Sequence, residues 1–365
     1  MRLSPAARRR LADLRLSAQL LGSRVAQSPA EAVRWMLGLQ AQDLPGVLWS
    51  VGLRSAATEA EVRAAFDAGE IVRSWPLRGT LHLVAAEDLH WMLELTTPRA
   101  IASESQRRRQ LGITDPDIER ARETAVASLP GRSALSRDAL LAAIAAGGVS
   151  TDGARGYHLL WFLAQTGTLV LGASHGRGQT FARLDAWVTR PRRLEKDEAL
   201  GELASRYVRG HGPASVEDLA RWSGLAVRDV RRGIAVAGDR LVEIELDGRS
   251  FLLDRAAADD DGRGDPVLLL PGFDEYLLGY RDRSAVLAPE HANAIVPGGN
   301  GVFRPTVVVG GEVVGTWSRT VRPREVVVEA AFFDGGPADE PRDLGQAALR
   351  YERFLERPVR VAARR

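Results

Sequence analysis

The fold is indicated most clearly by residues 211–254, which read HGPASVEDLARWSGLAVRDVRRGIAVAGDRLVEIELDGRSFLLD. Ser215 and Asp218 have the spacing of a capping box, in which two residues bond each other's backbone N–H at the start of a helix. Gly224 ends this predicted helix. A second helix is predicted from apolar residues that recur at helical spacing, namely Val227, Val230 and Ile234.

Two extended segments follow in the same stretch. Apolar residues alternate with polar ones at Val242, Ile244 and Leu246. Asp247-Gly248 is a strong signal for a tight hairpin turn, and Phe251 to Leu253 form the returning strand. Two helices followed by a hairpin are the element order of a winged helix.

The same order is predicted a second time over 132–187. A helix there is stopped by Gly147-Gly148, a second helix follows, and two extended segments flank a loop that carries Arg177. A basic, glycine-rich loop of this kind suits close approach to a phosphate backbone. The second unit is therefore a candidate DNA-binding module.

A looser copy precedes it over about 28–84. Ser28-Pro29 predicts one helix start, because serine caps helices and proline favours their first position. Thr58 and Glu61 predict another helix start by a capping box. Residues 71–84 are predicted as a hairpin with Arg78-Gly79 near its turn.

After residue 260 the pattern becomes rich in strands. Val267–Leu270 has the composition of a buried strand, and Gly310-Gly311 predicts a hairpin between Val302–Val309 and Val313–Trp317. A strand over Glu325–Phe333 and a closing helix complete the chain. The predicted class is α+β, with three tandem winged-helix domains at 1–105, 106–190 and 191–365, the last extended by C-terminal strands.

Composition restricts the function classes. The 365 residues suggest two or three domains, and 45% hydrophobic with 26% charged residues is typical of globular proteins. The absence of cysteine excludes disulfides, iron–sulfur clusters and thiolate zinc sites. No apolar run is long enough to span a bilayer and the N-terminus does not resemble a signal peptide, which favours the cytoplasm.

Charge leaves nucleic-acid binding open. The formal net charge is only +2, but Lys196 is the only lysine, so nearly every cation is an arginine. Arginine binds phosphates bidentately and stacks on bases better than lysine does. Codon usage in a GC-rich genome also accounts for an arginine excess. A phosphate-binding P-loop is excluded, because its GK[ST] motif is absent.

Gln40-Ala41-Gln42-Asp43 follows the glycine that ends an early helix. Two glutamines at i and i+2 in extended backbone point to the same side, so their amides can hold one water between them. Most such pairs, however, are merely exposed polar residues. Asp43 is the adjacent candidate for a general base, but a cap or loop hydrogen bond is the favoured interpretation.

The remaining polar residues carry weaker signals. The histidines lack the spacing of a zinc helix, so we expect no metal and no other cofactor. His82 stands apart because it lies near Arg78 and Thr80 in the first predicted hairpin. Gly298-Gly299-Asn300-Gly301 is predicted as a hairpin loop, and Arg304 just beyond it is a candidate DNA contact.

The second predicted helix of the third unit presents a basic face, made by Arg228, Arg231 and Arg232. Such a face could enter a DNA groove. However, the hairpin beside it carries Glu243, Glu245 and Asp247, which would repel phosphate. This unit is therefore predicted to be mainly structural.

Four stretches resemble one known family. They are LQAQD at 39–43, RSWPLRGTLHLV at 73–84, HGPA at 211–214 and LLPGFDEY at 269–276. In this order they resemble the winged-helix proteins grouped with the bacterial DNA glycosylase AlkZ, and the resemblance spans essentially the whole chain. The family's Gln-x-Gln signature matches Gln40 and Gln42, whereas the Gln-x-Asp form of a sister branch does not match.

The resemblance implies three winged helices around a concave DNA-binding channel, with Gln40 and Gln42 as catalytic residues. It also implies removal of bulky N7-alkylguanine adducts or interstrand cross-links left by an antibiotic. The expected partner is double-stranded DNA with an alkylated purine, bound by a monomer. The candidate DNA contacts are Arg73, Arg78, His82, Arg177 and Arg304.

Two functions remain open from the sequence. Alkylation at N7 puts positive charge on the purine, so hydrolysis needs mainly a positioned water. No lysine lies near the motif, which disfavours Schiff-base chemistry and predicts a monofunctional glycosylase. The alternative is a non-enzymatic winged-helix DNA-binding protein, such as a transcription regulator.

Overall fold

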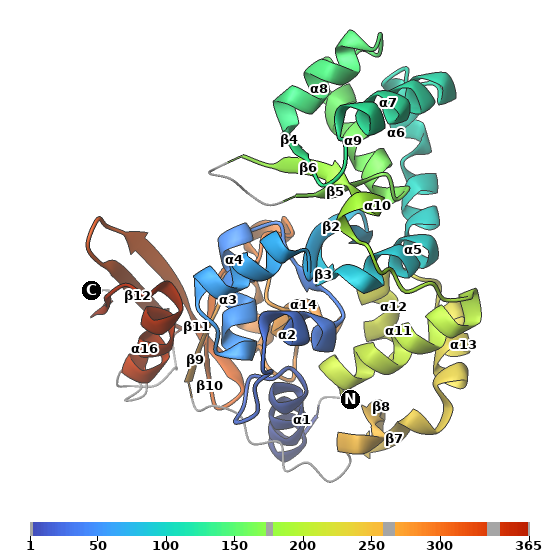
Figure 1. Ribbon diagram of the computed structural model, residues 1–365. Helices are drawn as coiled ribbons and strands as arrows, with labels where there is room; N and C mark the ends of the chain where they lie inside the picture. The colour runs from blue at the N-terminus through green and yellow to red at the C-terminus, as the bar shows by residue number, and fades with distance from the viewer. Residues whose placement is uncertain (1–2, 173–177, 258–266, 334–343, 364–365) are drawn as a thin grey trace. The chain divides into compact units, whose positions relative to one another are not determined.

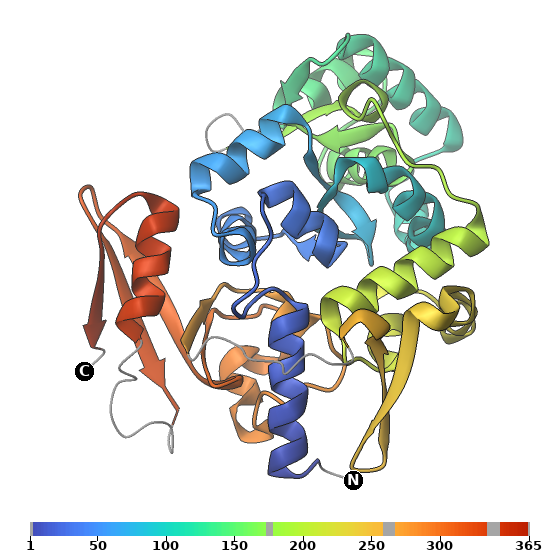
Figure 2. The same cartoon turned by 60° about the horizontal axis from the view of Figure 1, so that its bottom comes forward.

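The computed structural model describes residues 3–172, 178–257, 267–333 and 344–363. The chain forms two compact units. Unit 1 comprises 1–63, 200–222 and 226–365, and unit 2 comprises 64–199 and 223–225. Two of the boundaries between the units, after residues 63 and 199, fall within helices α4 (Glu59–Ala68) and α11 (Lys196–His211). Figures 1 and 2 show the elements in two views.

The N-terminal part of unit 1 is mainly helical. Its elements are α1 (Pro5–Ala18), α2 (Pro29–Met36), the short strand β1 (Leu39–Gln40) and α3 (Leu44–Ser55). Ser28 caps α2 by accepting a hydrogen bond from Glu31 N, as the sequence predicts. Thr58 and Glu61 form the predicted capping box of α4. The sequence did not predict α3, which is buried on most of its sides and so lacks a polar stripe.

Residues 211–254 contain the predicted elements: α12 (Val216–Ser223), α13 (Val227–Ala237), β7 (Leu241–Leu246) and β8 (Arg249–Asp254), with a 3-10 turn at Gly238–Arg240. Ser215 and Asp218 exchange the expected capping bonds, at 2.9 and 3.1 Å. Val227 is 39% exposed, however, and the buried face of α13 is formed instead by Val230, Gly233 and Ala237. A Cβ on Gly233 would lie 2.4 Å from Leu200 O, so this glycine permits close packing on α11.

The C-terminal part of unit 1 is a five-stranded sheet in the order β13-β12-β11-β10-β9 among the described residues. The strands are β9 (Val267–Leu270), β10 (Thr306–Val309), β11 (Glu312–Val321), β12 (Val326–Phe332) and β13 (Val359–Ala363). Helix α16 (Leu344–Leu355) lies beside this sheet (Figure 1) and contacts β9 and β13. Shorter elements precede β10: a 3-10 turn at Arg255–Ala257, α14 (Glu275–Leu278), a 3-10 turn at Pro289–His291, α15 (Ala292–Ile295) and a 3-10 turn at Pro297–Gly299.

Three expectations for this region are corrected. A helix does not close the chain, because β13 follows α16 and pairs in parallel with β12. Gly298-Gly299-Asn300-Gly301 is not a hairpin loop, since it lies in and after a 3-10 turn that follows α15. The strand predicted from Val302 begins only at Thr306, directly after Pro305, which has no N–H for a strand hydrogen bond.

Unit 2 combines an antiparallel sheet with helices. Its strands run in the order β3-β2-β5-β6-β4. They are β2 (Ile71–Leu77), β3 (Thr80–Ala85), β4 (Ala134–Ser136), β5 (Leu169–Leu171) and β6 (Thr180–Arg183). The helical elements are a 3-10 turn at Ala86–Asp88, α5 (Leu89–Ser103), α6 (Ser105–Gln110), α7 (Asp115–Ser128), α8 (Arg137–Ala146), α9 (Ala154–Gln165) and α10 (Leu184–Trp187). The predicted helices and strands of 132–187 and the hairpin of 71–84 are confirmed, whereas α5 to α7 were not predicted.

Three hairpins share one turn geometry. Arg78-Gly79, Asp247-Gly248 and Gly310-Gly311 each form a two-residue loop with positive φ at both positions. This is the geometry of the primed turns that match the twist of paired strands. The sequence located all three turns, because Gly, Asp or Asn at such positions lowers the strain of positive φ. Arg78 bears this strain without that relief, at φ 53°.

Candidate functional site

Gln40 and Gln42 lie together in unit 1, as the sequence predicts. Gln40 is the last residue of β1, and Gln42 lies in the segment between β1 and α3. The Gln40 Nε2 atom donates a hydrogen bond of 2.6 Å to Gln42 Oε1. Gln42 is exposed, whereas Gln40 is 8% exposed. The pair therefore connects a buried amide to the surface.

One acceptor of this pair is available for a further bond. Gln40 Oε1 is buried and has no hydrogen-bond partner among the described residues. A buried polar atom without a partner costs about 1–3 kcal/mol. Native structures keep few such atoms, and many of them bind an ordered water or a ligand. The Gln40 carbonyl oxygen thus lacks a hydrogen-bond donor within the described part of the chain.

Asp43 stands at the N-cap position of α3, but its side chain makes no cap hydrogen bond. The favoured cap interpretation is therefore wrong in that detail. The carboxylate instead lies over Gly46, where an added Cβ would come within 2.6 Å of Asp43 Oδ2. Asp43 is exposed. A carboxylate at the start of a helix is favoured by the helix dipole, which accounts for its position without a catalytic role.

The backbone of Gln40 is bound to a buried carboxylate. Gln40 N donates to Glu275 Oε1 at 3.1 Å, and Glu275 is 0% exposed. The other carboxylate oxygen, Oε2, accepts from Trp222 Nε1 at 2.9 Å. His211 Nε2 lies 3.5 Å from that same oxygen. Three of the quoted stretches, 39–43, 211–214 and 269–276, therefore meet at this point.

A second buried network lies beside Glu275. Asp274 accepts two hydrogen bonds of 2.9 Å from Arg54, and Ser50 Oγ donates to it at 2.8 Å. Arg54 also donates to Gln19 Oε1 at 2.9 Å. Gln19 Nε2 in turn donates to Tyr280 Oη at 3.0 Å. The stretch 269–276 is thus held from α1 and α3 by charge-assisted bonds inside the core.

The tyrosines of this network remain protonated. Complete burial raises the pKa of Tyr207, Tyr276 and Tyr280 far above the ordinary tyrosine value, because the phenolate would lose its solvation. Their hydroxyl groups donate to backbone oxygens: Tyr207 to Gly279, Tyr276 to Gly311 and Tyr280 to His211. These hydroxyl groups serve as structural hydrogen-bond donors and do not act as bases.

The predicted DNA contacts lie mainly in unit 2. Arg73 and His82 are buried in β2 and β3, at 7% and 0% exposure. His82 Nδ1 lies 2.9 Å from Thr80 O, so Nδ1–H donates there and Nε2 faces Arg78 Nη2 at 3.4 Å. Arg78 is partly exposed at the hairpin turn. The proximity of His82 to Arg78 and Thr80 agrees with the sequence, while their role on DNA stays a prediction.

The other predicted contacts are separate from this hairpin in sequence. Arg304 is exposed in the segment before β10 of unit 1. Arg177 lies outside the described residues. The basic face of α13 is exposed at Arg228, Arg231 and Arg232, next to the acidic strand β7.

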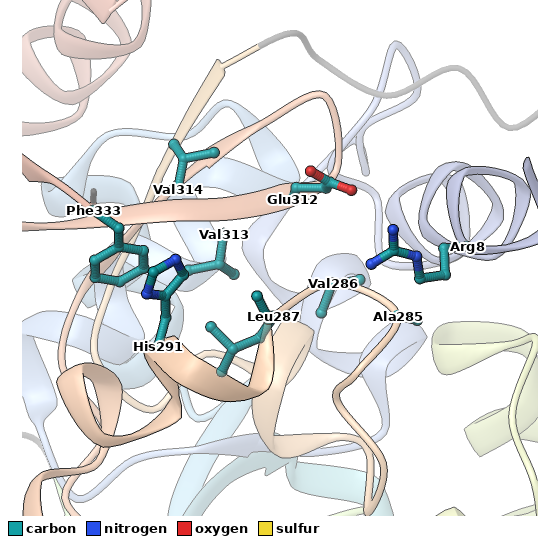
Figure 3. Close-up of a pocket in the computed structure, with 10 residues that line it drawn as sticks. Arg8, Ala285, Val286, Leu287, His291, Glu312, Val313, Val314 and Phe333 are labelled. Atoms are coloured by element: carbon teal, nitrogen blue, oxygen red, sulfur yellow. The ribbon is translucent and has the colours of Figure 1, made fainter. Parts of the chain in front are cut away.

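A cavity of about 130 Å³ lies in unit 1 (Figure 3). His291 and Phe333 stack at one side, with ring centroids 4.3 Å apart, and Arg8 lies at the other. None of the predicted site residues lines it. Within the described part of the chain, no cluster of three metal-ligating side chains occurs, and no helix is long and apolar enough to cross a membrane.

Comparison with known proteins decides the family. The family model described as DNA glycosylase AlkZ-like matches residues 33–354. The chain belongs to the AlkZ-like DNA glycosylases. A curated relative, the interstrand DNA cross-link repair glycosylase of Streptomyces sahachiroi, is 30% identical over 332 residues, which cover 86% of this chain and 88% of the relative.

The fold agrees with that assignment. The solved structure of the Streptomyces sahachiroi DNA glycosylase AlkZ matches with a TM-score of 0.79 and 27% identity, covering 97% of this chain and 99% of that one. This AlkZ-like protein is therefore a mixed α+β enzyme and a DNA glycosylase. Of the two functions that the sequence left open, membership of an enzyme family supports the glycosylase over the non-enzymatic regulator.

Sequence reasoning missed the support beneath the motif. Glu275 was part of a quoted stretch, but it received no role. Trp222 and His211 lie within the quoted stretch 211–254, where no local pattern assigns them a role beside Gln40. Their common signal is composition: an acidic residue, a histidine and an indole N–H within otherwise apolar surroundings.

Proposed function

We propose that this glycosylase hydrolyses the N-glycosidic bond of bulky N7-alkylated purines, including cross-linked guanines, with Gln40 and Gln42 positioning the water. The observation that carries this proposal is the 2.6 Å bond between the two amides next to the buried Gln40 Oε1 acceptor. The cross-link is suggested by the name of the Streptomyces sahachiroi relative, an interstrand DNA cross-link repair glycosylase.

The chemistry suits neutral amides. An alkyl group on N7 makes the purine cationic, so the bond between the sugar C1′ and the base breaks with its electron pair moving to the base. This neutralises the purine without a general acid. The attacking water oxygen forms the new bond to C1′ and releases its proton to solvent. Orientation of the water by Gln40 and Gln42 lowers the entropic part of the barrier.

The proposed DNA-binding surface remains that of three tandem winged helices, at 1–105, 106–190 and 191–365, which line a concave channel. A monomer would bind double-stranded DNA in this way. Arg78 and Arg304 are the better supported backbone contacts because both reach solvent. Arg177 is retained as a proposed contact. Arg73 and His82, at 7% and 0% exposure, are proposed to act on DNA binding by supporting the hairpin that carries Arg78.

The proposal is tested by single-turnover base release from a duplex that carries one N7-alkylguanine, and from a duplex cross-linked through guanine N7 by a nitrogen mustard. The Gln40→Ala, Gln42→Ala double variant should lose about 100-fold or more in rate, because misplaced reacting groups cost this much. Gln110→Ala replaces an exposed glutamine on α6 and is the matched control.

The control should react at the wild-type rate. Undiminished base release by the double variant would remove Gln40 and Gln42 from the mechanism. Release from the monoadduct but not from the cross-linked duplex would restrict the substrate to single adducts. Binding without an abasic product would support the regulator.

A further inference from the structure

Glu275 offers an explanation for the position of Gln40. It is fully buried at the start of α14, and its two carboxylate oxygens accept from Gln40 N at 3.1 Å and from Trp222 Nε1 at 2.9 Å. We propose that Glu275 is a positioning residue for base excision. Together with Trp222 and His211, it would fix the backbone of Gln40 so that the Gln40 amide meets Gln42. This inference rests on the proposed role of Gln40.

Gln40 lies in a short backbone element. β1 is only two residues long, and Leu37, just before it, has a positive φ of 64°. Gln42 lies in the segment between β1 and α3. A bond from a backbone N–H to a carboxylate is charge-assisted and roughly twice as strong as a neutral one. Glu275 is therefore a strong external anchor for this part of the chain.

The anchor is itself held from separate segments. Trp222 comes from α12, and His211 is the last residue of α11. His211 Nδ1–H donates to Tyr207 O at 3.2 Å, whereas Nε2 lies 3.5 Å from Glu275 Oε2 without a hydrogen bond, so His211 contributes packing to the anchor. The His211 ring stacks on Tyr207, with centroids 4.6 Å apart and planes inclined by 12°. The orientation of the Glu275 carboxylate is thus determined by packing as well as by hydrogen bonds.

Stability alone does not explain a carboxylate at this place. Burying a charge is costly unless it is paired and hydrogen-bonded, and apolar replacements of buried ionic groups are often neutral or stabilising. Here, two of the donors that face the carboxylate belong to the Gln-x-Gln segment and to an indole. The cost is understandable if the carboxylate sets the geometry of Gln40, since small displacements of reacting groups cost large factors in rate.

Glu275→Gln tests the inference with almost no change in volume. The amide has a single acceptor oxygen, so it cannot accept from both Gln40 N and Trp222 Nε1. One of these donors must face an NH₂ group. We expect a 10- to 100-fold lower single-turnover rate (about the cost of misplacing a reacting group), with unchanged affinity for undamaged duplex.

Asp274→Asn is the matched control. Asp274 is the neighbouring buried carboxylate, but it binds Arg54, Ser50 and Tyr276 N and makes no hydrogen bond to Gln40. Both variants are measured well below their unfolding temperatures. A comparable loss of rate in Asp274→Asn would show that any disturbance of this core lowers activity, and would overturn the inference.

A double-mutant cycle separates positioning from general damage. In a Gln40→Ala background the side chain that Glu275 positions is absent, so Glu275→Gln should lower the residual rate less than twofold. An equal fold-loss in both backgrounds would overturn the inference. If Gln40→Ala alone reacts at the wild-type rate, the proposed function of Gln40 fails first, which is a different outcome from a failure of Glu275.

Trp222→Phe provides a second variant should Glu275→Gln not fold. It removes the indole N–H that binds Glu275 Oε2 and keeps an aromatic ring in the core. We expect a smaller loss of rate, which again disappears in the Gln40→Ala background. An unchanged rate in Trp222→Phe, or a loss that is independent of Gln40, would contradict the inference.

Discussion

In unit 1 several ionic side chains pair inside the core, whereas in unit 2 most of the described ion pairs have at least one exposed partner. Arg54 and Asp274 pair at 0% and 3% side-chain exposure. In unit 2, Arg193 and Glu94 pair at 66% and 58%. Asp88 is buried, but its partner Arg192 is 36% exposed. The buried carboxylates of unit 1 also include Glu275, which accepts a hydrogen bond from Gln40 N.

The largest expected effect is on unit 1. Asp274→Ala leaves Arg54 buried without its carboxylate, and breaking a buried pair typically costs about 3–5 kcal/mol. We expect a correspondingly lower free energy of unfolding in urea, followed by circular dichroism. A loss below about 1 kcal/mol would mean that water or another acceptor compensates Arg54, and would weaken the comparison.

An effect of intermediate size is expected on the pH dependence of stability in unit 2. Burial lowers the pKa of His158 below the ordinary histidine value, because the charged ring would be desolvated beside Trp161. The unfolded chain therefore binds more protons at this residue than the folded one. Stability should fall as pH is lowered through about 6.5, the value of an unperturbed histidine.

His158→Gln removes this titration. Its unfolding temperature should decrease less than that of the wild type between pH 7 and pH 5, as followed by calorimetry. Burial also lowers the pKa of His90, which adds a contribution of the same sign and leaves some dependence in the variant. Identical pH profiles for the variant and the wild type would exclude His158 as a source.

The smallest effect is expected at the surface of unit 2. Arg193→Ala breaks the exposed pair with Glu94, whose atoms are 3.4 Å apart. Exposed pairs contribute less than about 1 kcal/mol, because water and salt screen both charges. The free energy of unfolding should change by no more than this. A loss as large as that of Asp274→Ala would show that the two units do not differ in the way described.

The sequence predicted the local features of the fold well. Ser215 with Asp218 and Thr58 with Glu61 are three residues apart, and Asp247-Gly248 forms its turn within two residues. Such signals act over a few residues, so a pattern can detect them. The proximity of Gln40 and Gln42 was predictable for the same reason, since it follows from the alternation of an extended chain.

The remainder depends on contacts between distant segments. Gln40 and Glu275 are 235 positions apart, and no spacing rule connects them. The parallel pairing of β13 with β12 likewise depends on α16 returning the chain to the sheet. Helix α3 is buried around most of its circumference, because Gly52 admits the Phe354 ring and Trp49 donates to Leu269 O. The sequence of α3 therefore lacks the apolar stripe on a single face by which a helix is predicted.

Helix α1 has a practical consequence for how this protein is divided. The match to the family model begins at residue 33, after α1 has ended. Yet Arg15 of α1 donates to Pro213 O at 3.1 Å and stacks over the Tyr280 ring at 3.6 Å. A polypeptide expressed from residue 33 onward would retain the region that matches the family model, while lacking a helix that packs against Pro213 and Tyr280 of that region. Similarity marks where homology can be detected, and the folding boundary lies further toward the N-terminus.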